Sequence, residues 1–211
     1  MFKIAVLASG GGTNLQAIID KIKDGYINAS IEIVIGSKEG IYALERAKKN
    51  NIKTSVVSKK EFGKETSNEI LKLVENVDLI VLAGYLSILE GEILNKFKNR
   101  IINIHPSLIP AFCGDKMYGE YVHKAVIEKG VKYSGCTVHF VNEEVDGGAI
   151  ILQDIVGVDF NDTYETLQKK VLVKEHIALP KAIKLISEDK IQIVENKVNI
   201  KEEVCIWKKE L

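Results

Sequence analysis

The chain has few of the features that mark secreted, membrane-bound or nucleic-acid-binding proteins. Its three cysteines, Cys113, Cys136 and Cys205, form no close pair, which indicates reduced thiols rather than a disulfide framework. No apolar run approaches the ~18 residues of a membrane helix, and the N-terminus lacks a signal-peptide pattern. Lysine plus arginine and aspartate plus glutamate both total 29, so there is no basic excess for nucleic acid. We therefore expect a cytoplasmic protein with small-molecule partners, as a monomer or weak homodimer.

Histidine is scarce too, and nothing resembles a zinc site, because the His, Cys and Asp residues lack metal-ligand spacing. We therefore expect no metal. His123 and His176 fall in helical segments far apart in the chain. His139 is expected to point inward from a strand, either as a core residue or as a neighbour of a catalytic group.

The pattern of apolar residues predicts an α/β fold. Short apolar runs such as Ile4–Ala8 alternate with helical patterns through the first 104 residues, which indicates βαβ units and a doubly wound, mainly parallel sheet. After Pro110 two strand-like runs surround an Asp-Gly-Gly turn, which predicts an antiparallel hairpin added to a Rossmann-like N-terminal half. We expect one domain over 1–211, made of two halves at 1–100 and 101–211. The expected strands are 4–8, 31–35, 54–57, 78–83, 100–104, 137–141, 149–153, 191–194 and 198–200, and the expected helices are 42–49, 60–75, 88–98 and 164–188.

The end of the fifth expected strand carries the most informative motif, Asn-Ile-His-Pro-Ser-Leu. Asn103 and His105 are two residues apart, so in a strand both side chains point to the same face. Pro106 ends the strand, which places both near its carboxyl end, where open α/β sheets bind ligands. With Asp146, from the Asp-Gly-Gly turn, they make a candidate acid–base and oxyanion-binding set. Either residue of the pair taken alone could be structural, and Asp146 could simply be a turn residue.

A glycine-rich segment, Ser-Gly-Gly-Gly-Thr-Asn at 9–14, lies between a buried strand and an amphipathic helix. Glycines allow close backbone approach, and a helix N-terminus offers free amides to a phosphate. A tight turn with Thr13 or Asn14 as helix cap is the structural alternative. Leu15 stands where the dinucleotide fingerprint needs glycine, the second strand has no acid at its end, and no GK[ST] follows. The pattern favours a single phosphate on a small substrate.

These motifs together resemble a known family. Ser-Gly-Gly-Gly-Thr-Asn-Leu-Gln-Ala-Ile at 9–18, Leu-Ala-Gly-Tyr at 82–85, Asn-Ile-His-Pro-Ser-Leu-Ile-Pro at 103–110 and Thr-Val-His-Phe-Val with Asp-Gly-Gly and Ile-Leu-Gln at 137–153 are similar to the phosphoribosylglycinamide formyltransferases. The likeness runs in order over nearly the whole chain. It implies transfer of a formyl group from 10-formyltetrahydrofolate to the amine of glycinamide ribonucleotide in purine biosynthesis. It also implies that 1–100 is the phosphate-binding half and 101–211 the catalytic and folate-binding half.

The resemblance also implies roles for individual residues. Asn103 and a protonated His105 would donate hydrogen bonds to the oxyanion that develops at the formyl group. Asp146 would stabilise the imidazolium and receive the amine proton, directly or through water. The residues implied to bind the phosphoribosyl substrate are Gly11, Gly12, Thr13, Asn14 and Glu175. Those implied to contact the folate are Tyr85, Leu86, Ser87, Ile88, Leu89, Phe140, Val141 and Val145.

Three features depart from the family pattern. Ser87 stands where some members have arginine, and Leu172 stands where a glutamine can help to bind the nucleotide. The segment 112–119 is longer than the common version, with Tyr118 and Gly119 as candidate substrate contacts.

Other functions remain as alternatives. A formyltetrahydrofolate deformylase would use the same trio to hydrolyse the cosubstrate, and we expect it to carry an additional N-terminal domain. A methionyl-tRNA formyltransferase would need a further C-terminal domain and a basic face. A non-catalytic nucleotide-binding module has no need of the trio, and a nicotinamide oxidoreductase is disfavoured by Leu15.

Overall fold

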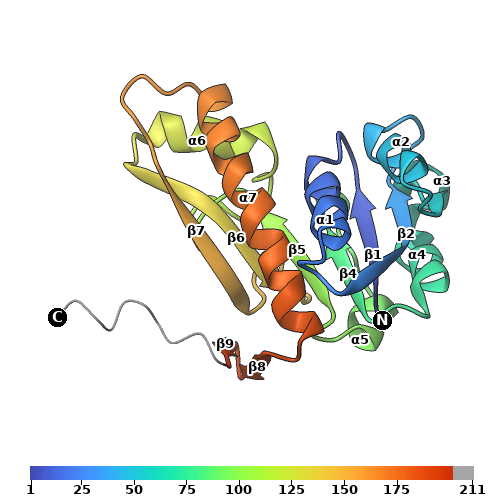
Figure 1. Cartoon of the computed structure of the whole chain (residues 1–211). Helices are drawn as coiled ribbons and strands as arrows, with labels where there is room; N and C mark the ends of the chain where they lie inside the picture. The colour runs from blue at the N-terminus through green and yellow to red at the C-terminus, as the bar shows by residue number, and fades with distance from the viewer. Residues whose placement is uncertain (202–211) are drawn as a thin grey trace.

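Strands and helices alternate along the chain and assemble around one large sheet (Figure 1). A computed structural model describes residues 1–201, so Cys205 lies outside the described residues. The strands are β1 (Phe2–Ala8), β2 (Ala29–Gly36), β3 (Thr54–Val56), β4 (Leu79–Leu82), β5 (Ile101–His105), β6 (Tyr133–Phe140), β7 (Ile150–Gly157), β8 (Ile191–Val194) and β9 (Lys197–Ile200). The helices are α1 (Thr13–Lys23), α2 (Tyr42–Lys49), α3 (Lys59–Phe62), α4 (Thr66–Val74), α5 (Glu92–Lys96), α6 (Glu120–Lys129) and α7 (Tyr164–Ser187), with a 3-10 turn at Gly63–Glu65.

The main sheet has the strand order β3-β2-β1-β4-β5-β6-β7, and β8 and β9 form a separate two-stranded sheet. The first five strands pair in parallel, whereas β6 runs antiparallel to β5 and β7 antiparallel to β6. The predicted doubly wound, mainly parallel sheet with an antiparallel hairpin in the C-terminal half is therefore confirmed.

Helices cover both faces of the sheet, which explains the continuous apolar runs of its central strands. On one face Ile4 and Val6 of β1 pack in a core with residues of α1, α2, α6 and α7. On the other face Ala5 and Leu7 pack against α4 and α5. Figure 1 shows α1 and α7 side by side in front of the sheet.

Glycines shorten two of the predicted helices. The helix predicted at 60–75 is broken into α3, the 3-10 turn and α4, because Gly63 takes a positive φ of 55° that ends α3. The helix predicted at 88–98 contracts to α5, which begins after Gly91 at a φ of 76°. By contrast α2 spans the residues expected, and α7 ends one residue before the predicted end.

The parallel strands bring two predicted motifs to one edge of the sheet. Ala8, at the end of β1, leads into the glycine-rich segment, and His105 ends β5. Only β4 separates β1 from β5, so both motifs lie at the same carboxyl edge. Within residues 1–201 no helix combines the length and apolarity needed to cross a bilayer. Cys113 and Cys136 are both free thiols.

Candidate active site

Strand β5 presents Asn103 and His105 on one face, as the period of two predicts. The antiparallel pairing with β6 sets Asn103 opposite His139 and His105 opposite Thr137. His105 is 4% exposed and His139 is 2% exposed, so both imidazoles are held within the protein rather than in solvent. Four polar side chains from two neighbouring strands therefore form one cluster at the end of β5.

Asp146 completes this cluster from the loop between β6 and β7. Its backbone has a φ of 57°, a left-handed conformation that aspartate tolerates better than most residues. Its Oδ2 lies 3.6 Å from His105 Nδ1, and its Oδ1 lies 3.6 Å from His139 Nε2. Oδ2 also accepts a 3.0 Å hydrogen bond from the Gly114 amide. The carboxylate thus lies between two imidazoles.

The surroundings of Asp146 favour its charged form. Burial alone would raise the pKa of this carboxyl, but the Gly114 amide, the charge of His105 and, when its Nε2 carries a proton, His139 outweigh burial and hold the pKa below its usual value. The carboxylate can therefore accept a proton or stabilise a neighbouring positive charge.

His105 is held at both ring nitrogens. Nε2 lies 2.9 Å from the Phe112 carbonyl oxygen and donates to it, while Nδ1 faces Asp146. Burial is the largest influence on this imidazole and lowers its pKa, against the opposing effects of Asp146 and the Phe112 carbonyl. The lowered pKa disfavours the imidazolium that the sequence resemblance implies, so the charged form depends on the ion pair with Asp146.

Ser107, two residues after the end of β5, makes hydrogen bonds that hold the local backbone. It is fully buried, and its hydroxyl donates a 2.6 Å hydrogen bond to the Ala111 carbonyl. Thr137 Oγ1 donates to the Ser107 carbonyl at 2.7 Å and accepts from the Ile109 amide at 3.1 Å. Gln153 Nε2 donates to the same hydroxyl at 3.0 Å. These bonds fix the turn after β5 and leave Ser107 without an activating base.

The glycine-rich segment forms an open helix start. Gly12 precedes α1 at a φ of 69°, and neither Thr13 nor Asn14 caps the helix with its side chain. A Cβ on Gly12 would lie 2.7 Å from the Cα of Ala43, so the segment fits closely against α2. The first amides of α1 are therefore available to an anion, at the positive end of the helix dipole.

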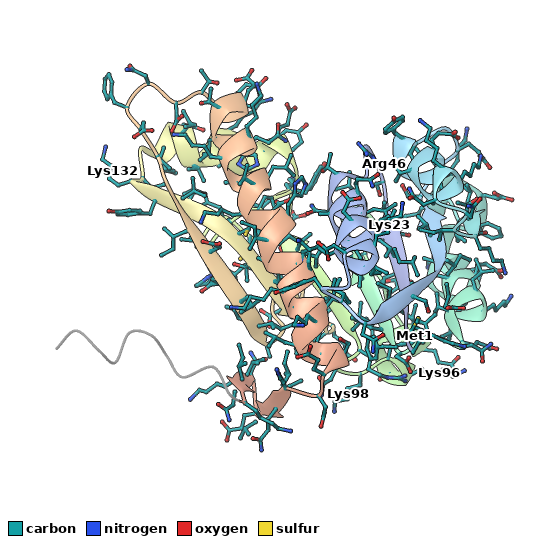
Figure 2. The ribbon with its side chains drawn as sticks, viewed as in Figure 1. Met1, Lys23, Arg46, Lys96, Lys98 and Lys132 are labelled. Atoms are coloured by element: carbon teal, nitrogen blue, oxygen red, sulfur yellow. The ribbon has the colours of Figure 1, made fainter. Side chains whose placement is uncertain are left out.

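Side-chain hydrogen bonds help to tie this segment to the rest of the protein. Arg46, labelled in Figure 2, donates from Nε to the Gly11 carbonyl at 2.8 Å. Asn14 donates from Nδ2 to Glu175 Oε2 at 2.7 Å, and Glu175 is only 8% exposed. Burial raises the pKa of Glu175, although the Asn14 hydrogen bond opposes the shift. Asn14 and Glu175, 161 residues apart in the chain, are thus brought together.

The residues predicted to contact folate lie after β4 and at or after the end of β6. Ser9 Oγ accepts a 2.9 Å hydrogen bond from the Leu86 amide, which links their loop to the glycine-rich segment. The side chains of Leu86, Ile88 and Val145 are apolar and exposed. Such side chains can pack against a flat heterocycle. The remaining members are buried or half-buried: Tyr85, Ser87, Leu89, Phe140 and Val141.

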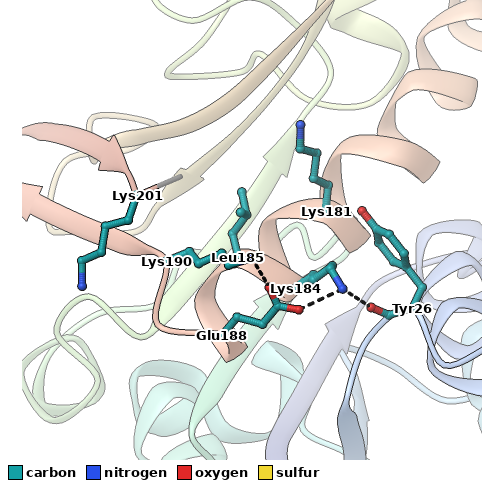
Figure 3. Close-up of a pocket in the computed structure, with 7 residues that line it drawn as sticks. All are labelled: Tyr26, Lys181, Lys184, Leu185, Glu188, Lys190 and Lys201. Atoms are coloured by element: carbon teal, nitrogen blue, oxygen red, sulfur yellow. Dashed lines mark hydrogen bonds and ion pairs between the residues drawn. The ribbon is translucent and has the colours of Figure 1, made fainter. Parts of the chain in front are cut away.

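Elsewhere, a hollow of about 140 Å³ lies between the end of α7, Tyr26 and Lys201 (Figure 3). Lys184 spans it, donating to the Tyr26 carbonyl at 3.1 Å and pairing with Glu188 at 2.8 Å. None of the predicted site residues lines it. No cluster of His, Cys, Asp and Glu suited to a metal occurs among the residues that the structure describes.

Sequence reasoning missed several of these partners. Phe112 and Gly114 act through backbone atoms, so their side chains give no signal. Thr137 and Gln153 become recognisable only once the register of β5, β6 and β7 is known.

Comparison with known proteins identifies the family. A sequence model described as formyl transferase matches residues 2–183. The chain belongs to the formyl transferase family. Among relatives of this family, phosphoribosylglycinamide formyltransferase from Haemophilus influenzae is 42% identical over 200 residues, covering 93% of this chain and 92% of the relative. The crystal structure of glycinamide ribonucleotide transformylase 1 from Symbiobacterium toebii superposes with a TM-score of 0.91 at 40% identity, covering 96% and 95% of the two chains.

Other proteins to which the chain is similar are longer. The trifunctional purine biosynthetic protein adenosine-3 of Gallus gallus is 43% identical over 197 residues, which cover 92% of this chain but 19% of that protein. The chain thus spans about a fifth of the length of this trifunctional relative. A formyltetrahydrofolate deformylase from Pseudomonas syringae has a TM-score of 0.87 at 25% identity, covering 95% of this chain and 66% of that one.

Proposed function

We propose that the chain transfers the formyl group of 10-formyltetrahydrofolate to the amine of glycinamide ribonucleotide, a reaction of purine biosynthesis. The observation that carries the proposal is the convergence of Asn103, His105 and Asp146 at the carboxyl end of β5. An amide, an imidazole and a carboxylate at one point suit acyl transfer to an amine. The names and the identities of the relatives point to the same reaction.

The first step joins the amine nitrogen to the formyl carbon, and the formyl oxygen becomes an oxyanion. Asn103 Nδ2 and the His105 imidazole act as hydrogen-bond donors to this oxygen. Such preorganised donors stabilise the transition state of acyl transfer by roughly 3 kcal/mol each. Both nitrogens of His105 already face protein acceptors, so donation to the oxyanion requires that its contact with Phe112 or with Asp146 be exchanged.

The second step breaks the bond between the formyl carbon and the folate nitrogen. Asp146 accepts the proton released by the attacking amine, directly or through a water, and the departing nitrogen takes up a proton. The low pKa of Asp146 keeps it charged for this role. No covalent enzyme intermediate is needed, in agreement with the engaged hydroxyl of Ser107.

The two substrates would meet at the trio. We assign the phosphate to Gly11, Gly12, Thr13 and Asn14 at the start of α1, with Glu175 beneath it toward the ribose. We assign the folate to the loops after β4 and β6, where Leu86 and the other folate residues lie. The phosphate site thus belongs to residues 1–100, apart from Glu175, and the catalytic trio to the half from 101 onward.

Several wider features remain part of this proposal. We propose a cytoplasmic enzyme that acts on small molecules, without nucleic-acid or membrane partners, as a monomer or weak homodimer. The free thiols of Cys113 and Cys136 support a reducing compartment.

The test follows release of tetrahydrofolate from 10-formyltetrahydrofolate, with and without glycinamide ribonucleotide. We expect release that depends on the amine and matches formylated product mole for mole. Release without the amine would instead indicate that the protein hydrolyses 10-formyltetrahydrofolate. This is the deformylase alternative, which is supported by the similarity to the Pseudomonas syringae structure. Absence of release in both conditions would refute both enzymatic functions.

A further inference from the structure

His139 is a buried titratable group that the proposed reaction does not use. It lies on β6 directly opposite Asn103 on β5, and its side chain is 2% exposed. Its Nε2 lies 3.2 Å from Asn103 Nδ2, and its Nδ1 lies 2.8 Å from the Phe140 carbonyl oxygen. Both ring nitrogens therefore have defined partners.

The partner of Nδ1 determines which nitrogen of His139 carries the proton. A carbonyl oxygen can only accept a hydrogen bond, so Nδ1 must be the donor to Phe140. In the neutral ring Nε2 then has a lone pair and no hydrogen. An acceptor at Nε2 requires a donor opposite it, which is the amide nitrogen of Asn103 and not its oxygen. The Phe140 carbonyl thus determines, through the tautomer of His139, which way the Asn103 amide is oriented.

This orientation has no other support from side chains. Within residues 1–201 the bond to His139 is the one hydrogen bond of the Asn103 side chain. An asparagine amide turned by 180° occupies the same space, so packing alone selects poorly between its two orientations. The amide nitrogen has two hydrogens, and one remains for the oxyanion when the other binds His139.

We propose that His139 is a positioning residue, which holds the Asn103 amide with its N–H groups toward the reacting formyl group. The role in catalysis rests on the proposed formyl transfer. A flipped amide would present its oxygen to the oxyanion and repel it. The carboxylate of Asp146, 3.6 Å from Nε2, would favour a proton there, and such a proton would oppose the N–H of Asn103. The neutral Nδ1–H form of His139 is therefore the competent one.

The first experiment does not depend on activity. Two-bond ¹H–¹⁵N correlation spectra of the imidazoles, recorded near neutral pH on ¹⁵N-histidine-labelled protein, report the tautomer of each ring. A His139→Gln variant assigns the signal. We expect a neutral Nδ1–H ring for His139. An Nε2–H ring or an imidazolium would overturn the proposal even if the enzyme proves inactive in formyl transfer.

The second experiment is a double-mutant cycle in the formyl-transfer assay. We expect Asn103→Ala to lower kcat by about 100-fold or more and His139→Leu by roughly 10- to 100-fold, with KM changed less than about threefold. Because His139 acts through Asn103, adding His139→Leu to Asn103→Ala should cost less than about threefold more. Multiplicative losses, or an active His139→Leu, would refute the positioning role.

Two further variants separate positioning from folding. His123→Leu removes another imidazole, also 2% exposed, from α6 without touching Asn103, and its effect should multiply with that of Asn103→Ala. His139→Gln retains an acceptor for the Asn103 amide and should recover part of the kcat lost in His139→Leu. If His139→Leu does not fold, the cycle is measured with His139→Gln, for which coupling to Asn103 is again required. If the wild-type protein does not transfer the formyl group, the proposed function fails. If it does and the double-mutant cycle shows no coupling, only the positioning role of His139 fails.

Discussion

Strands β1 and β4 contrast with β5 and β6, although all four lie at the centre of one sheet. The buried positions of β1 and β4 are all apolar, and these strands fill the two cores. The buried positions of β5 and β6 include His105, Thr137 and His139. A buried polar group costs free energy unless it is hydrogen-bonded. The first pair of strands stabilises the fold, and the second holds the polar side chains of the proposed active site.

The difference follows from how the strands are joined. Parallel strands need helical crossovers, which cover both faces and require apolar side chains there. The antiparallel pairing of β5 with β6 sets side chains directly opposite one another, so that Asn103 meets His139 and His105 meets Thr137. A polar cluster can therefore be satisfied internally at this end of the sheet. We expect substitutions in β1 and β4 to lower the free energy of unfolding, and substitutions in the polar cluster of β5 and β6 to lower kcat.

The largest effect is expected from Asp146→Asn, which changes the polar cluster that Asp146 forms with His105 and His139. Asparagine tolerates the left-handed backbone at this position but carries no charge to accept the amine proton. We expect kcat for formyl transfer to fall by about 10²- to 10⁴-fold, with KM for both substrates largely unchanged. Steady-state kinetics measures this, and circular dichroism checks the fold. Wild-type rates would exclude Asp146 from the mechanism.

The matching substitution in the apolar core is Leu7→Ala on β1, at a fully buried position. Loss of its buried methyl groups leaves a cavity, so we expect the free energy of unfolding to fall by about 2–5 kcal/mol. Denaturant titration measures the change. The kcat per folded molecule should remain close to wild type. Ile155→Ala on β7 is the matched control, because Ile155 is 59% exposed and should cost less than about 1 kcal/mol. Equal losses from both would contradict the contrast.

Stability should also depend on pH through His123, a buried imidazole on α6 that is influenced by the charge of His105. Burial is the larger influence and the charge of His105 the smaller, and together they lower the pKa of His123 from 6.5 to about 4. The unfolded chain then binds the proton more tightly, so this stability is full above pH 6.5 and is lost as pH falls toward 4. The loss at pH 4 is on the order of 3 kcal/mol. His123→Leu should remove that part of the acid sensitivity in urea titrations across this range. Parallel curves for variant and wild type would argue against it.

The contrast also separates what the sequence predicts well from what it predicts poorly. Apolar periodicity predicted β1 and the bounds of α2, because buried strands and amphipathic helices have distinct periods. Gly63 and Gly91 interrupt helices that the same periodicity extends too far, because a positive φ overrides the apolar pattern. Local backbone conformation is the weak point of the prediction.

The trio itself could be predicted only in part. The shared face of Asn103 and His105 follows from the strand period, but the distance to Asp146 depends on a left-handed residue in the loop after β6. The pairing of Asn103 with His139 depends on strand register, which no local pattern specifies. Contacts from Phe112 and Gly114 involve main-chain atoms of any residue type.

Glu175 tests whether the contrast extends to the phosphate side, and we expect its effect to be the smallest. Burial raises the pKa of Glu175 above 4.5, more than the Asn14 hydrogen bond lowers it. The folded protein therefore binds this proton more tightly than the unfolded chain. The resulting stability is full below pH 4.5 and is lost as pH rises through the folded pKa, opposite in sign to His123. Glu175→Gln keeps an acceptor for Asn14 but no titrating group. Thermal unfolding from pH 4 to 8 should therefore show the variant gaining stability over wild type as pH rises. A constant difference would mean that folding leaves the pKa of Glu175 unchanged, because the Asn14 hydrogen bond offsets its burial.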